Sequence, residues 1–320
     1  MIGREATAAA EAEHAPAEVK EGLAPRSVAA GTRSEVACRI CSSEEYELFL
    51  EARGFRIVQC KSCGLWFVNP QPTTEELAQF YASYDDGEQW RFGEENFNRG
   101  VRKAILRFKR EGAVLDVGCG SGNFLRCMRE AGFSVAGIEP SKTGSQYGET
   151  VQGIEIFNGM VEEYLIENAQ RRFDVVTLLN VLEHLTDPKR TLLRLREAMA
   201  PGAALAVVVP DARFHALLGS VRRALRLSDP YWLGRSHGFL SGFKLPDHLT
   251  SFGPHTISLL LERCGFGIRA IQNAPVVWNE ELHRNAAKLL VRCVFGAVQY
   301  ATLGRLLFGY STLVIAQNGR

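Results

Sequence analysis

The pattern of apolar and polar positions becomes regular at about residue 113. From there, short apolar runs alternate with segments whose apolar residues recur every three or four positions. The first pattern is typical of buried strands and the second of amphipathic helices. The predicted strands are 113–117, 133–138, 154–157, 173–179, 203–209, 266–271 and 311–316. Strands alternating with helices of this length predict an α/β fold with a doubly wound, Rossmann-like, seven-stranded and mostly parallel sheet.

The predicted helices lie between these strands, and local signals mark where some of them begin. Asp187 followed by Pro188 is a typical start, with a capping side chain and then a proline in the first turn. Thr73 and Glu76 form a capping box before the main domain. The predicted helices are 95–109, 121–130, one from 141, 161–168, one from 187, and 254–264.

Composition and rhythm together divide the chain. The predicted parts are a disordered tail at 1–34, a small zinc-ribbon-like β-module at 35–72, a helical linker or cap at 73–110 and the main domain at 111–320. Two stretches interrupt the alternation of strands and helices in the main domain. Residues 211–246 are predicted to form a lid insertion, and residues 281–308 a helical insertion.

Charge and hydropathy narrow the classes of partner. The 320 residues carry a formal net charge of +1, so nothing global favours a polyanion, and nucleic acid is not an expected partner. No segment reads as a signal peptide, and charged residues interrupt the apolar stretch 286–308, so the cytoplasm is the expected location. Attachment of 281–308 to a membrane surface is a less favoured alternative to packing within the protein. The pattern predicts no particular oligomeric state.

A glycine-rich turn follows the first strand of the main domain. Gly118, Gly120 and Gly122 alternate with other residues between the strand and a helix. Glycine permits sharp turns and lets a ligand approach the backbone. Glu139 ends the second strand 21 residues after Gly118, where an acid can reach a pair of ribose hydroxyls. The Gly-x-Gly-x-Gly spacing departs from the dinucleotide fingerprint Gly-x-Gly-x-x-Gly and suits a cofactor without a pyrophosphate.

Four segments together carry a family resemblance. They are the turn at 115–122, the strand end at 137–141, the segment 180–188 after the fourth strand, and the C-terminal pattern from Asp247 to Phe266. As a set they resemble class I S-adenosylmethionine (SAM)-dependent methyltransferases, closest to the branch that includes ubiquinone-biosynthesis O-methyltransferase-like enzymes. The resemblance covers roughly residues 113–272 and implies a SAM cofactor and a methyl-transfer activity.

The resemblance also implies roles for individual residues. Asp116, Gly118 and Gly120 would cradle the amino-acid end of SAM, within a turn that also contains Cys119 and Gly122. Glu139 would hold the ribose, and Asn180 would line the methyl-donor pocket. The acid that often meets the adenine after the third strand is absent here. Backbone groups of Gly159 and Met160, or the side chain of Asn158, are the expected replacements.

Two cysteine pairs occupy the N-terminal module. Cys38 and Cys41 form one Cys-x-x-Cys turn, Cys60 and Cys63 the other, and 18 residues separate the two turns. This spacing is typical of a tetrahedral zinc site. Four thiolates leave no position for water, so the zinc is expected to be structural. Coincidence, a redox pair and a rubredoxin-like iron site are the alternatives. Such modules also resemble those of a bacterial methyltransferase group often found in polysaccharide, deoxysugar or secondary-metabolite pathways.

Two histidines are candidates for a catalytic base. His184 follows the fourth strand, at the sheet edge where ligands bind in open α/β folds, and His248 lies beside Asp247. A helix cap or a buried hydrogen-bonded histidine is an equally weighted alternative for each. Tyr81 and Tyr84 are expected in a core or rim, with one of them a candidate to cover the SAM pocket.

The function predicted from these observations is methyl transfer from SAM to a small-molecule acceptor. The expected reaction is O-methylation, and the expected acceptor is a sugar, a polysaccharide precursor or a secondary metabolite. An RNA methyltransferase that uses the zinc module for binding is one alternative, and the low net charge opposes it. A nicotinamide-dependent enzyme is another, and the glycine spacing opposes it. A non-catalytic zinc-bearing Rossmann adaptor is a third, which would not need an intact glycine turn and Glu139.

Overall fold

A computed structural model describes residues 33–52, 54–73, 75–77, 95–211, 213, 247–275, 293 and 310–319. Three predictions lie almost entirely outside these residues: the tail at 1–34, the lid insertion at 211–246 and the helical insertion at 281–308. The same holds for Tyr81 and Tyr84. Within the described residues, no helix is long and apolar enough to cross a membrane.

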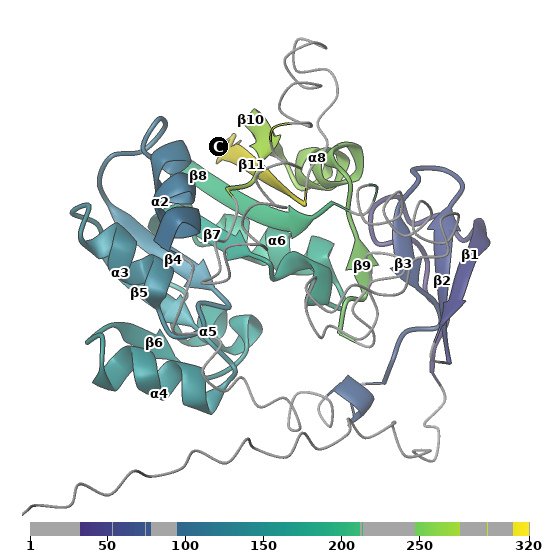
Figure 1. The fold of residues 1–320 in the computed structure, drawn as a ribbon, viewed down its shortest axis with the longest axis horizontal. Coiled ribbons are helices and arrows are strands. Elements are labelled where there is room, and N and C mark those ends of the chain that lie inside the picture. The colour runs from purple at the N-terminus through teal and green to yellow at the C-terminus, as the bar shows by residue number, and fades with distance from the viewer. Residues whose placement is uncertain are drawn as a thin grey trace, which may run out of the picture. The chain divides into compact units, whose positions relative to one another are not determined.

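The main sheet has seven strands, as the alternating pattern predicts (Figure 1). They are β4 (Ala113–Val117), β5 (Ser134–Ile138), β6 (Glu155–Phe157), β7 (Phe173–Leu179), β8 (Met199–Pro210), β10 (Phe266–Asn273) and β11 (Ser311–Asn318). Their order is β10-β11-β8-β7-β4-β5-β6. The pairs within β6-β5-β4-β7-β8 are parallel, whereas β11 runs antiparallel to both β8 and β10. The prediction of a mostly parallel, doubly wound sheet is confirmed.

Helices cover this sheet. They are α2 (Glu95–Ile105), α3 (Asn123–Arg129), α4 (Lys142–Thr150), α5 (Val161–Glu167), α6 (Pro188–Glu197) and α8 (Pro254–Arg263). The capping signals act as predicted: Asp187 Oδ1 accepts from the Arg190 amide at 3.0 Å, and the Thr73 and Glu76 amides each donate to the other's side chain. Helix α3 begins later than predicted because Gly122 has a φ of +77°, which a right-handed helix cannot include.

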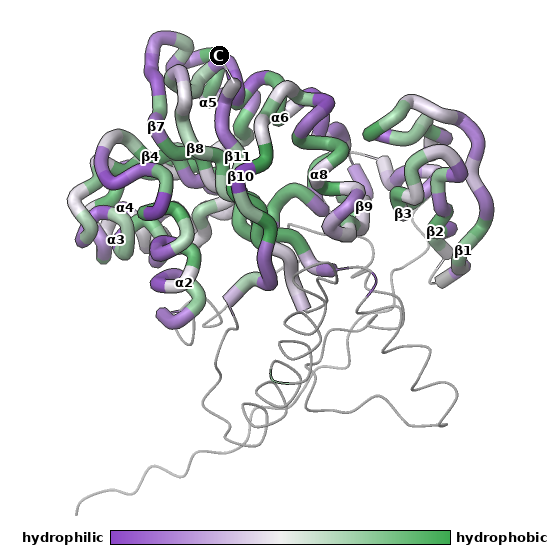
Figure 2. The backbone as a smooth tube through the Cα atoms, turned by 90° about the horizontal axis from the view of Figure 1, so that it is seen from above, coloured by the Kyte–Doolittle hydropathy of each residue, from purple (hydrophilic) through white to green (hydrophobic). Residues whose placement is uncertain are grey.

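The core has two apolar layers, one on each face of the sheet. Alternate residues of one strand point to opposite faces, so Leu205 and Val207 of β8 pack in one layer and Ala204 and Ala206 in the other. Helices α5, α6 and α8 contribute to the first layer, and α2 and α3 to the second. Figure 2 shows hydrophobic positions gathered along the strands, as expected for a sheet buried on both faces.

The cysteine-bearing segment forms a second, antiparallel sheet. Its strands are β1 (Tyr46–Ala52), β2 (Phe55–Cys60) and β3 (Trp66–Val68), and the fourth is β9 (Thr250–Ser251), from far along the chain. The apolar runs predict β2 and β3. Neither β1 nor β9 was expected, because β1 carries charged and exposed residues and β9 is too short to show a pattern. The pair β3–β9 therefore joins the module to the C-terminal half of the chain.

Candidate active site and cysteine cluster

The glycine-rich turn leaves β4 at the carboxyl edge of the parallel strands. Gly118, Gly120 and Gly122 all have positive φ, at +68°, +55° and +77°, a region that L side chains rarely adopt. The amides of Gly118 and Cys119 both donate to the carbonyl of Ile138, at 2.8 and 3.1 Å, and so fasten the turn to β5. The turn therefore has a fixed shape, and its glycines carry no Cβ that would keep a small ligand from the backbone.

Asp116 lies directly below this turn and is 2% exposed. Its Oδ1 accepts a hydrogen bond from the Thr177 hydroxyl of β7 at 2.5 Å. Thr177 was not predicted as a site residue, although a polar residue within an otherwise apolar strand is a visible signal. The bond between β4 and β7 holds the Asp116 carboxylate at the point where the two central strands end.

Glu139 lies at the end of β5 and faces the turn. Its Oε2 accepts from the Gly120 amide and its Oε1 from the Ser141 amide, each at 2.8 Å. These two bonds fix the Glu139 carboxylate against the glycine-rich turn and the start of α4. The structure thus brings Asp116, the three glycines and Glu139 together, as the sequence predicts.

The end of β6 differs in detail from expectation. The Met160 backbone amide donates to Glu163 Oε2 at 2.9 Å and so caps α5. The side-chain nitrogen of Asn158, Nδ2, donates to the carbonyls of Glu139 and Pro140. Both groups serve the local turn. The Met160 side chain, 50% exposed, presents an apolar surface on the β6 side of the sheet.

Asn180 follows β7 in a left-handed conformation with a φ of +58°. A residue other than glycine in this region is uncommon and often marks a functional turn. Its amide donates to the Val208 carbonyl at 2.9 Å, and its side chain is exposed at the carboxyl edge. A short 3₁₀ helix, η2 (Leu182–His184), comes next and carries the first candidate base.

The two candidate bases lie side by side although 63 positions separate their segments. The His184 and His248 rings meet edge to face with centroids 4.8 Å apart. His184 Nδ1 is 3.0 Å from the Asp247 carbonyl oxygen. Because a carbonyl only accepts, His184 Nδ1 is the donor in this contact.

Two buried carboxylates accompany this histidine pair. Glu183 is 1% exposed, with Oε1 4.0 Å from His184 Nε2, and Asp247 Oδ2 lies 3.7 Å from His184 Nδ1. Glu183 was not predicted as a site residue, and only its position next to His184 after a strand end could have indicated it. One ligand atom from each of Glu183, His184 and His248 lies within 4.8 Å of the others, close enough to surround a cation.

The four module cysteines converge as predicted. All four Sγ atoms lie within 4.8 Å of one another, with Cys38–Cys63 at 3.5 Å and Cys41–Cys60 at 3.4 Å. Zn–S bonds of about 2.3 Å place tetrahedral thiolates about 3.8 Å apart, so the set fits such an ion. The hydrogen bond between Cys38 and Cys63 lowers the pKa of the Cys38 thiol and raises that of the Cys63 thiol, so Cys38 is the first of the two to become a thiolate.

The two cysteine turns share one backbone design. Ser42 follows the first pair and Gly64 the second, with φ values of +60° and +75°. Their amides donate to the carbonyls of Cys38 and Cys60, at 2.8 and 2.9 Å. Each turn thereby directs two thiols to one side. Outside this set, Cys119, Cys127 and Cys264 are buried as core residues, whereas Cys293, whose apolar sequence neighbours also predict a core position, is exposed.

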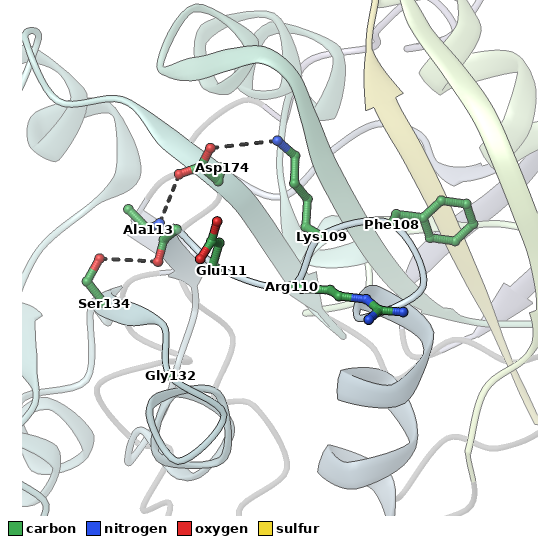
Figure 3. Close-up of a pocket in the computed structure, with 9 residues that line it drawn as sticks. Phe108, Lys109, Arg110, Glu111, Ala113, Gly132, Ser134 and Asp174 are labelled. Carbon is green, nitrogen blue, oxygen red and sulfur yellow. Dashed lines mark hydrogen bonds and ion pairs between the residues drawn. The ribbon is translucent and has the colours of Figure 1, made fainter.

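A pocket at the other end of the sheet is distinct from this site (Figure 3). It is bordered by the first residues of β4, β5 and β7, namely Ala113, Ser134 and Asp174. Asp174 accepts from the Ala113 amide at 3.0 Å and pairs with Lys109 at 3.7 Å. Ligands of open α/β sheets bind at the carboxyl edge, so this pocket at the amino edge is not the expected cofactor position.

Comparison with known proteins assigns the main domain. The sequence matches a family of methyltransferase domains over residues 89–271, more than half of the chain. The chain belongs to this methyltransferase family. Taken with the sheet order and its antiparallel β11, the match confirms the expected class I SAM-dependent methyltransferase.

Two similar curated proteins share one name, ubiquinone biosynthesis O-methyltransferase. The methyltransferase is 30% identical over 128 residues to a ubiquinone biosynthesis O-methyltransferase of Caulobacter sp. (strain K31), covering 36% of this chain and 51% of that one. It is 32% identical over 125 residues to that of Aromatoleum aromaticum, covering 38% and 52%. The chain thus spans about half the length of the curated relatives that it matches.

Solved structures with a similar fold include other methyltransferases. A SAM-dependent methyltransferase from Archaeoglobus fulgidus is 20% identical with a TM-score of 0.46, covering 72% of this chain and 96% of that one. The N-methyltransferase NodS from Bradyrhizobium japonicum WM9, in complex with S-adenosyl-L-homocysteine (SAH), is 11% identical with a TM-score of 0.47, covering 76% and 98%.

Proposed function

We propose that the protein transfers a methyl group from SAM to a hydroxyl of a small-molecule acceptor at the carboxyl edge of β4, β5 and β7. The observation that carries the proposal is the joining of the glycine turn to Glu139, through the 2.8 Å bond from the Gly120 amide to Glu139 Oε2. This geometry supports a ribose-binding acid next to a turn that admits an amino-acid group.

The proposed function assigns a place among the described residues to each part of the cofactor. Glu139, which the Gly120 and Ser141 amides hold beside the turn, would accept hydrogen bonds from the ribose hydroxyls. Asp116 and the backbone of Gly118 and Gly120 would meet the charged amino-acid end. The Gly159 backbone and the apolar side chain of Met160 would border the adenine, since the Met160 amide already serves as a helix cap.

Methyl transfer to a hydroxyl asks the protein for alignment and for removal of one proton. Bound SAM would supply an electrophilic methyl group on a sulfonium sulfur. His184 would accept the acceptor's proton at Nε2, because its Nδ1–H is held by the Asp247 carbonyl. His248, in ring contact with His184, would orient it or relay the proton outward. General-base catalysis of this kind contributes about 10²–10⁴-fold to a rate.

The acceptor class is proposed from two sources. The curated relatives are named as O-methyltransferases, which favours a hydroxyl acceptor. The cysteine module resembles that of methyltransferases acting on sugars, polysaccharide precursors or secondary metabolites, so we favour an acceptor of that kind. A net charge of +1 gives no support to an RNA acceptor. The Cys38, Cys41, Cys60 and Cys63 set would hold a structural zinc ion.

The experiment that tests this function is calorimetric titration of the full chain with SAH, and separately with NADH. We expect micromolar binding of SAH and none of NADH. Glu139→Ala should weaken SAH binding by at least about 30-fold, because it removes hydrogen bonds to a charged group. Glu149→Ala, an exposed acid on α4, is the matched control and should leave binding unchanged.

Thermal unfolding of both variants separates a lost ligand contact from a lost fold. Glu139→Ala also frees the Gly120 and Ser141 amides, so some loss of stability is expected while the protein remains folded. Preference for NADH over SAH, or SAH binding that survives Glu139→Ala unchanged, would refute the assignment of this site.

A further inference from the structure

One buried peptide segment connects the cysteine module to the histidine pair. The Leu249 amide donates to the Glu183 carbonyl, and the Leu249 carbonyl accepts from the Val68 amide, both at 2.9 Å. Leu249 itself is 0% exposed. It directly follows His248, and Glu183 directly precedes His184. The backbone that places both histidines is therefore hydrogen-bonded to strand β3 of the module.

The module holds this segment at more than one point. Strand β3 pairs with β9 through Phe67↔Thr250 and Trp66↔Ser251, immediately after Leu249. On the other cysteine turn, the Ile40 carbonyl accepts from Arg263 Nη1 of α8 at 2.9 Å. The segment from His248 to the end of α8 is thus linked to both cysteine turns. The turn of Cys60 and Cys63 is linked through β3, which pairs with β9, and the turn of Cys38 and Cys41 through the bond from Arg263.

The metal site lies a few residues from both links. Ile40 stands between Cys38 and Cys41, and β3 begins three residues after Cys63. The Cys60 amide donates to the Leu65 carbonyl at 2.9 Å, which ties the second turn to the start of β3. A displacement of the four thiols would therefore also displace the backbone of β3, including Val68, because only a few residues and one hydrogen bond separate them.

Packing follows the same route as the hydrogen bonds. Cys38, Cys60 and Phe67 belong to the apolar layer that also contains Leu182, two residues before His184, and Phe252, four residues after His248. Protein interiors are close-packed and transmit displacement rather than absorb it. The cysteine module and the histidine turn are thus parts of one packed layer.

We propose that the metal-loaded cysteine module is a positioning element for the active site: it fixes Leu249 and thereby holds His184 and His248 against each other. This inference rests on the proposed function, because positioning of His184 and His248 matters for activity only if these histidines act in methyl transfer. The cofactor turn depends on other bonds, since Gly118 and Cys119 are fastened to Ile138 and Gly120 to Glu139. Metal loss should therefore disturb the histidines while sparing cofactor binding.

The test compares the zinc-loaded full chain with the same chain after chelation, and with Cys41→Ser. Hydrogen exchange measured by mass spectrometry reports the backbone at 181–186 and 247–252, and histidine-labelled protein reports the ring environments by NMR. SAH titration reports the cofactor site. Cys293→Ser is the matched control, because Cys293 is an exposed cysteine outside the cluster.

Metal loss is expected to speed exchange at 247–252 and 181–186 by about tenfold or more, as local opening of a released segment does. The His184 and His248 signals should shift together, and the SAH dissociation constant should change less than about threefold. Cys293→Ser should behave as the unaltered chain. Unchanged exchange and unchanged histidine signals after confirmed metal loss would overturn the proposal. Global unfolding with loss of SAH binding would also overturn it, in favour of a purely stabilising metal.

A second variant keeps the test decisive if Cys41→Ser does not fold. Arg263→Met removes the donor to the Ile40 carbonyl and leaves the thiols in place, and Glu262→Gln on the same helix is its control. We expect Arg263→Met to retain the metal and to speed exchange at 247–252 by about threefold. No change there would contradict the proposal. If SAH fails to bind the zinc-loaded chain, the proposed function falls, while the exchange comparison still decides the positioning role.

Discussion

Gly118 has a φ of +68°, and a Cβ built there would lie 2.6 Å from Val181 Cγ2. Gly153 has a similar φ of +61° but nothing within 4 Å of the same position. The two glycines thus share a backbone conformation and differ in their surroundings. Val181 precedes η2, so a side chain at Gly118 would press the cofactor turn against the turn that carries His184.

This pair gives a residue-scale prediction. Gly153→Ala should lower the free energy of unfolding by about 1 kcal/mol, the strain of a left-handed alanine. Gly118→Ala should cost about 2 kcal/mol or more, because the clash adds to that strain, and should weaken SAH binding at least about tenfold. Urea unfolding and calorimetry measure both effects. Equal costs for the two variants would show that Val181 yields, and Gly118→Ala with Val181→Ala should recover part of the binding.

Sequence reasoning at this scale succeeded where strand geometry decides the position. The alternating glycines and the distance to Glu139 follow from a strand, a turn and a second parallel strand, so their meeting could be predicted. Backbone groups of Gly159 and Met160, or the Asn158 side chain, are the expected adenine contacts; that the Met160 amide caps α5 depends on the Glu163 rotamer, which the sequence does not show. The backbone at Glu183 is held by a hydrogen bond from the amide of Leu249, which lies 66 positions further along the chain, and local sequence does not show such a contact.

Helix α6 follows the histidine turn, and its first residues fix where that turn ends. Asp187 accepts from the Arg190 amide at 3.0 Å, and the cap is completed by Pro188 in the first turn. Loss of a capping side chain typically costs about 1 kcal/mol. The boundary between the site and the helix is therefore set by a single local interaction.

The element-scale prediction concerns this cap. Asp187→Ala should lower the free energy of unfolding by about 1 kcal/mol, whereas Asp187→Asn, which keeps an accepting oxygen, should cost only a few tenths. Denaturant unfolding of the two variants measures the difference. A loss of the same size for both would mean that the charge, not the cap, stabilises this end of α6.

The burial of each strand or helix decides whether the pattern of apolar and polar residues could predict it. Strands β4, β7 and β8 are buried on both faces and read as mostly apolar runs, and α8 shows a regular apolar face. Strand β1 lies at the edge of its sheet with Leu48 and Phe49 exposed, so its pattern does not separate an inner from an outer face. The two residues of β9 form a strand only because β3 is there to pair with them.

At the scale of the whole molecule, four cysteines bring two distant turns together and support a sheet that includes residues from the C-terminal half. The chain must close a long loop before β3 and β9 can pair, and that closure costs conformational entropy. An ion held by all four thiolates would offset this cost, because metal binding free energy adds to folding free energy where the site exists only in the folded state.

The corresponding prediction is that each chain holds one zinc ion, which elemental analysis of the purified protein measures directly. Replacing it with cobalt should give the visible absorption of a tetrahedral thiolate site. Cys60→Ser should lower the metal content well below one and lower the unfolding temperature. Cys264→Ser, a buried cysteine outside the cluster whose Sγ donates to the Lys189 carbonyl at 3.8 Å, should keep the full metal content. Iron in place of zinc would keep the structural role and change the ion. A metal-free chain with an unaltered unfolding temperature would contradict the role itself, since the converging thiols would then need no cation to hold β3 beside the active site.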